Sequence, residues 1–87
     1  MKRKFTLSLK YALIILAAES LSGESFPMTG EAKRIVEDGY CLDGCECRAF
    51  EESAGIAYDY ITSHGLKKEA EEKMKEIFDE SATDAQL

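Results

Sequence analysis

Three cysteines and one histidine are the residues whose types could bind a metal. Cys41, Cys45 and Cys47 lie close together, and His64 follows them in the chain. These side chains could supply the ligands of a tetrahedral Cys3His zinc centre. However, their spacing matches none of the usual zinc-binding pairs. A helix over residues 48–64 would also place His64 about 24 Å along its axis from the cysteines, whereas zinc ligands lie within ~2.3 Å of the ion. We therefore expect no metal and no other cofactor, with a metal- or redox-responsive cysteine cluster as an alternative.

Recognisable catalytic patterns do not accompany these residues. The sequence contains no Gly-rich phosphate loop, no His-Glu-x-x-His motif and no nucleophile elbow, and it has a single histidine. Because His64 precedes Gly65 at the expected end of a helix, it is placed to cap the last carbonyl groups of that helix. We expect a protein that is not an enzyme.

A series of acidic residues near the C-terminus is the strongest indication of a binding surface. On a helix that begins at Lys67, one arc contains Glu69, Glu72, Glu76, Asp79 and Glu80, with Lys68 and Lys73 at its edges. Glu52 and Asp59 would extend this arc if the preceding helix packs antiparallel to the last one. Carboxylates at this spacing repel one another, and a partner with Lys and Arg would relieve the repulsion. The alternative is a solvated face that keeps a small protein soluble.

The overall charge indicates the kind of partner. Lys and Arg total 11 and Asp and Glu total 17, so the net charge is −6. A domain of this sign is poorly suited to binding nucleic acid directly, and it is better suited to a basic protein surface. In size and charge the chain is similar to the broad class of small phage antagonists of restriction or CRISPR machinery. That likeness implies an inhibitor or regulator that imitates nucleic acid on a nucleic-acid-handling protein.

Apolar periodicity and stop signals predict four helices in a chain read as one domain over residues 1–87. The expected ranges are 8–22, 29–38, 48–64 and 67–81, preceded by a basic arm or short strand over 1–7 and followed by a frayed tail over 82–87. The pair Asp43-Gly44 matches a two-residue β-hairpin turn. The predicted fold class is therefore mainly α, a small bundle of three to four helices with a possible short hairpin at Asp43-Gly44.

The N-terminal segment decides where the protein acts. Lys2, Arg3 and Lys4 followed by the apolar run Tyr11–Ala18 are similar to a secretory signal, but Lys10 and Glu19 interrupt the pattern. We expect a cytoplasmic protein that keeps this segment; a secreted protein that loses its first 22 residues is the alternative. The chain has no apolar run of the ~18 residues that span a bilayer. The helix over Tyr11–Leu21 is apolar around most of its circumference, which is typical of a core helix or of a homodimer interface.

Overall fold

The backbone forms four helices and no strand over the residues that the computed structural model describes, 7–38 and 44–86. Side chains are described for residues 9–38 and 47–79. The helices are α1 (Leu7–Ser22), α2 (Thr29–Asp38), α3 (Gly44–Ser63) and α4 (Lys67–Gln86). Within these ranges, no helix is long and apolar enough to cross a membrane. The predicted fold class, a small and mainly helical bundle, is confirmed.

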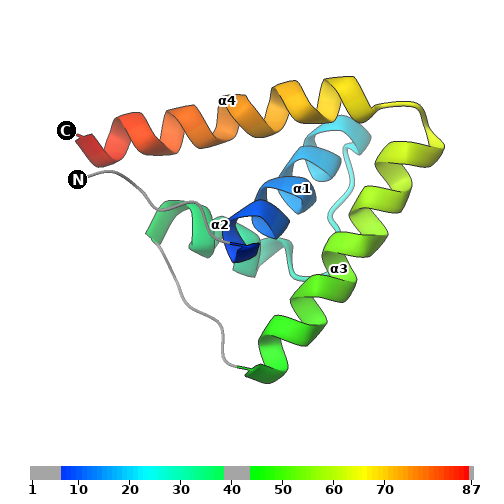
Figure 1. Ribbon diagram of the computed structural model, residues 1–87, viewed down its shortest axis with the longest axis horizontal. Helices are drawn as coiled ribbons and strands as arrows, with labels where there is room; N and C mark the ends of the chain where they lie inside the picture. The colour runs from blue at the N-terminus through cyan, green and yellow to red at the C-terminus, as the bar shows by residue number, and fades with distance from the viewer. Residues whose placement is uncertain (1–6, 39–43, 87) are drawn as a thin grey trace.

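Helix α1 lies at the centre of the bundle, with the other three helices arranged around it (Figure 1). All of its side chains from Ala12 to Ala18 are buried, and Leu9 is buried as well. A helix that is apolar around most of its circumference needs other elements to cover most of its surface. Helices α2, α3 and α4 all pack against α1 and make few contacts with one another. A homodimer through this helix stays a prediction. The apolar residues that would form its interface already pack against other helices of the same chain.

Helix α2 buries Ala32, Ile35 and Val36 along one edge. Thr29 has the residue type of an N-cap, but its hydroxyl bonds backward rather than into the helix. Thr29 Oγ1 accepts a hydrogen bond from the Phe26 amide at 2.9 Å and donates one to the Phe26 carbonyl at 2.7 Å. Met28, between them, has φ of 63°. This left-handed residue costs roughly 1–2 kcal/mol, and the two bonds of Thr29 hold the turn closed around it.

Helix α3 packs on α1 through Phe50, Ala54, Ala57 and Ile61, which are all buried. It also fastens the connector between α1 and α2. The buried Ser53 hydroxyl donates a hydrogen bond to the Pro27 carbonyl. The Phe26 ring meets the Tyr60 ring edge-on, with ring centres 5.8 Å apart. Tyr58, one residue after the buried Ala57, is 43% exposed at the edge of that face.

The possible β-hairpin at Asp43-Gly44 is not supported. Gly44 begins α3, and the residues of the second expected strand, 45–47, belong to this helix. Residues 40–43, which would form the rest of the hairpin, lie outside the described residues. A hairpin needs a strand on each side of its turn. Once a helix is nucleated, each further residue adds a backbone hydrogen bond at little cost. Helix α3 accordingly begins at Gly44, four residues before its predicted start at Arg48.

The chain turns from α3 into α4 at Gly65, through a Schellman motif. Gly65 has φ of 66°, the Leu66 amide bonds the Ile61 carbonyl at 2.9 Å, and the Gly65 amide bonds the Thr62 carbonyl at 3.2 Å. From this turn α3 and α4 diverge as the two arms of a V, with α1 between them (Figure 1).

Helix α4 covers α1 with a shallow apolar stripe. Ala70 is buried, whereas Leu66, Met74, Ile77 and Phe78 are partly buried against the core. The helix is assigned to Gln86, five residues beyond its predicted end at Ser81. Because only one side of α4 meets the bundle, its remaining circumference is free to present polar side chains.

Candidate partner-binding surface

The acidic face of α4 is defined by four exposed carboxylates, Glu69, Glu72, Glu76 and Asp79. At 1.5 Å per residue they extend over about 15 Å of the helix axis. At 100° per residue their arc lies beside and behind the apolar stripe that contacts α1. The structure therefore brings these four predicted residues together on one side of one helix. Glu80 belongs to the same helix, and its side chain lies outside the described residues.

One lysine contact partly neutralises this face. Lys73 Nζ lies 3.8 Å from Glu76 Oε2, and the two side chains are 31% and 59% exposed. An ion pair this long and this open to water contributes at most about 1 kcal/mol, and often nothing measurable. Lys73 therefore leaves Glu76 available to a stronger cationic partner.

Glu52 and Asp59 are also exposed, but on α3. Both lie opposite the buried stripe of α3 when the helix is projected at 100° per residue. Since α3 and α4 meet only near the Gly65 turn and then diverge (Figure 1), these two residues do not continue the acidic face of α4. The antiparallel pairing that would have joined the two sets of carboxylates is not the arrangement of the bundle.

The acidic face instead continues toward α1 and α2. A hollow of about 280 Å³ lies beside Glu76 and Lys73, and Glu19 of α1 and Glu37 of α2 also line it. Lys33 is the other charged residue of its lining. The wall thus carries three carboxylates and two lysines. Sequence reasoning missed Glu19 and Glu37 because neither shares a helix or a periodic pattern with the residues of α4.

The candidate metal ligands of the alternative reading, the three cysteines and His64, are not brought together among the described side chains. Cys47 is exposed in the first turn of α3, Cys41 lies outside the described residues, and the side chain of Cys45 does as well. His64 follows the other end of α3, about 25 Å from Cys47 along the axis. The side chains that are described contain no group of three His, Cys, Asp or Glu able to hold a metal ion.

His64 has a local structural contact in keeping with its expected capping role. Its Nδ1 lies 2.9 Å from the Tyr60 carbonyl oxygen, within hydrogen-bonding distance when that nitrogen carries a proton. The imidazole also stacks on the Tyr60 ring, with ring centres 4.1 Å apart and an interplanar angle of 26°. These contacts close the C-terminus of α3 just before the turn.

Comparison of the chain with known protein families, with curated proteins and with solved structures found no match. The acidic face of α4, with its continuation toward Glu19 and Glu37, is the described surface that follows most directly from the predicted binding residues.

Proposed function

We propose that this chain is a small protein-binding module, an inhibitor or regulator, that docks the acidic face of α4 on a basic surface of a nucleic-acid-handling protein. In this proposal the acidic face of α4 imitates the charge of a nucleic-acid strand, and the protein acts in the cytoplasm. The module carries out no chemistry of its own; it competes with nucleic acid for a groove rich in Lys and Arg.

The observation that carries the proposal is the linear density of exposed carboxylates. Glu69, Glu72, Glu76 and Asp79 follow one another at intervals of about 4.5–6 Å along the helix axis. A single strand of duplex DNA provides one phosphate per ~3.4 Å. A groove whose cations are spaced to meet phosphates could therefore meet these carboxylates. On the side toward α1 and α2, Glu19 and Glu37 add two carboxylates and Lys33 adds one opposing charge.

The packing of α4 supports the same proposal. Its apolar stripe is occupied by α1, so the acidic face is held by a helix that is fixed on the core. Side chains on a rigid helix lose less freedom on binding than side chains on a loop, which favours affinity. Charge complementarity of this kind mainly raises the association rate, and salt weakens it.

The proposal is tested by removing three charges without changing the shape of the face. The variant carries Glu69→Gln, Glu72→Gln and Glu76→Gln, and a matched control carries Glu51→Gln, Glu52→Gln and Asp59→Asn on α3. Both change the net charge equally, so they differ only in where the charge is lost. The immobilised proteins are incubated with a nuclease-treated cell lysate, and bound proteins are quantified after elution with duplex DNA.

We expect the unaltered protein and the α3 control to retain nucleic-acid-binding proteins that the added DNA releases. The α4 variant should retain at least tenfold less of the same proteins. Equal loss from both variants would show that total charge matters rather than the acidic face of α4. Equal retention by all three, or binding that DNA does not displace, would contradict the imitation of nucleic acid.

A further inference from the structure

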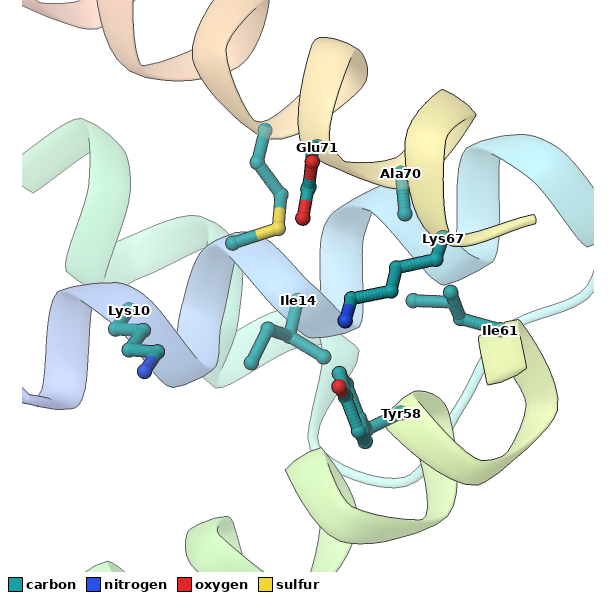
Figure 2. A pocket seen from close by; sticks show the side chains of 8 residues that line it. Lys10, Ile14, Tyr58, Ile61, Lys67, Ala70 and Glu71 are labelled. Carbon is teal, nitrogen blue, oxygen red and sulfur yellow. The ribbon is translucent and has the colours of Figure 1, made fainter. Parts of the chain in front are cut away.

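An apolar groove lies on the surface of α1, between the diverging arms of α3 and α4. It consists of two adjoining hollows of about 200 and 390 Å³, which share Lys10, Ile14 and Tyr58 in their linings. Figure 2 shows side chains from all three helices around the smaller hollow. The groove owes its shape to the V of the bundle, because α3 and α4 separate here and leave one side of α1 open. It is therefore an apolar surface able to receive a partner.

Tyr58 and Gly55 give this groove a projection and a space that match each other. The Tyr58 side chain lines both hollows and is 43% exposed, so it forms a ridge between them. Gly55 lines the larger hollow, and a Cβ atom added there would meet no other atom within 4 Å. The two positions are three residues apart, which places them on the same side of α3. A ridge beside a space on one helix is complementary to a second copy of that helix related by a two-fold axis.

The charged groups of the groove are balanced. Its linings contain two lysines, Lys10 and Lys67, and two glutamates, Glu51 and Glu71, in a protein whose total charge is −6. None of these four forms an ion pair among the described side chains. Two copies of an anionic protein repel each other, and the repulsion is weakest where the local charge is zero. Equal numbers of both signs also allow each lysine to meet a glutamate of the other copy.

We propose that this groove is the interface of a homodimer, in which α3 of one copy packs antiparallel on α3 of the other. A two-fold interface is isologous, so the Tyr58 ring of each copy enters the space above Gly55 of the other. Glu51 lies one turn before Gly55 and comes to the Tyr58 end of the other groove. The side chain of Lys67 extends toward Tyr58 there (Figure 2), which gives Glu51 a partner of opposite charge.

The dimer is separate from the acidic face of α4. The four carboxylates of that face line neither hollow. At 100° per residue they lie on the far side of α4 from Lys67 and Glu71. The dimer therefore carries two acidic faces that both point away from the interface, and it forms whether or not those faces bind a basic protein.

Sedimentation equilibrium of the full chain measures the association, at concentrations from ~10 µM to ~1 mM. We expect a reversible equilibrium between monomer and dimer with a Kd on the order of 10–100 µM, because the two linings involve fewer residues than the ~20–30 a side of a standard interface. A chain that stays monomeric at the highest concentration leaves the groove to a different occupant, and the proposal is overturned.

Gly55→Gln separates the interface from the fold. Within one chain the new side chain meets open space and improves the helix, so the melting temperature should rise by about 2–4 °C. Between two chains it fills the space that receives Tyr58, so the dimer should weaken at least tenfold. Gly30→Gln is the matched control, since Gly30 is a helical glycine of α2 that also meets no atom within 4 Å and lies outside the groove. The proposal is overturned if Gly55→Gln still forms the dimer, or if both variants lose it equally.

A pair of charge variants tests whether the groove recognises its own copy. One variant carries Lys10→Glu and Lys67→Glu, and the other carries Glu51→Lys and Glu71→Lys. Each variant alone places like charges on both sides of the interface and should dimerise at least tenfold more weakly than the unaltered protein. An equimolar mixture restores opposite charges and should form a heterodimer.

The matched control for the first charge variant carries Lys68→Glu and Lys75→Glu. Both lysines are exposed on α4 outside the groove, and the control has the same total charge as that variant. It should keep the dimer. If the control loses the dimer equally, total charge rather than the groove governs association. That result, or a mixture that contains no heterodimer, would overturn the proposal.

Discussion

The turn between α3 and α4 can be tested by changing two glycines to alanine, because one has a left-handed backbone and the other a helical backbone. Gly65 has φ of 66°, and Gly55 lies inside α3, where φ is not left-handed. A Cβ atom added at either position would meet no other atom within 4 Å. Packing therefore does not contribute, and any effect of a change to alanine comes from the backbone alone.

The expected effects have opposite signs. Gly65→Ala forces an L-residue into the left-handed region, which costs about 1–2 kcal/mol, offset in part by the lower entropy of the unfolded chain. Gly55→Ala removes a flexible residue from a helix interior and stabilises by about 0.5–1 kcal/mol. For a protein of this size each kcal/mol moves the melting temperature by about 4–8 °C. The two variants should therefore melt at temperatures that differ by roughly 6–24 °C.

Thermal and urea unfolding, followed by circular dichroism at 222 nm, measure both effects. Gly65→Asn is a useful third variant, because asparagine enters the left-handed region more easily than alanine and should recover part of the loss. If Gly65→Ala is as stable as the unaltered protein, the chain does not end α3 through a left-handed residue. If both alanine variants shift stability in the same direction, the assignment of α3 through Gly55 is wrong.

Substitutions at three further positions test the packing around α1 and the connector. Ser53→Ala removes the hydrogen bond to the Pro27 carbonyl and should destabilise by about 1 kcal/mol in urea unfolding. Thr29→Val removes both hydrogen bonds to Phe26 while keeping the side-chain shape, and should cost about 1–2 kcal/mol; Thr29→Ser should cost less. Phe50→Ala leaves a cavity at a residue that is 1% exposed, and should cost about 3–5 kcal/mol, visible as a much lower melting temperature. Losses below about 0.3 kcal/mol in all three would contradict this description of the core.

The helices were predictable because their signals are local. The offsets of three and four residues between Ala32, Ile35 and Val36 place one side of α2 in the core, and the glycine at position 65 ends α3. Such patterns depend only on residues within a few turns of one another. The apolar circumference of α1 predicted either a core helix or a homodimer interface, and the structure shows it in the core of this chain.

The start of α3 and the role of Thr29 were not predictable from the same kind of signal. The Asp43-Gly44 pair is a strong turn signal in isolation, but the helix that follows extends back to Gly44. Thr29 has the residue type of an N-cap, yet the left-handed Met28 turns the chain so that the hydroxyl faces Phe26. In each case neighbouring structure outweighs a local preference.

The binding surfaces show the same limit more clearly. The four carboxylates of α4 share one helix, so their alignment follows from spacing alone. The addition of Glu19 and Glu37, and the separation of Glu52, follow from how the helices cross, which spacing does not encode.

The dependence of every helix on α1 has a consequence for the synthesis of the protein. Helix α1 leaves the ribosome before the residues that cover it, and at about 5–20 residues per second the last of them follow several seconds later. During that interval α2 is its earliest available cover, and the apolar surfaces that later receive α3 and α4 remain in contact with water. The yield of this protein should therefore depend on translation speed and on chaperone capture. It should depend less on the free energy of unfolding of the finished fold.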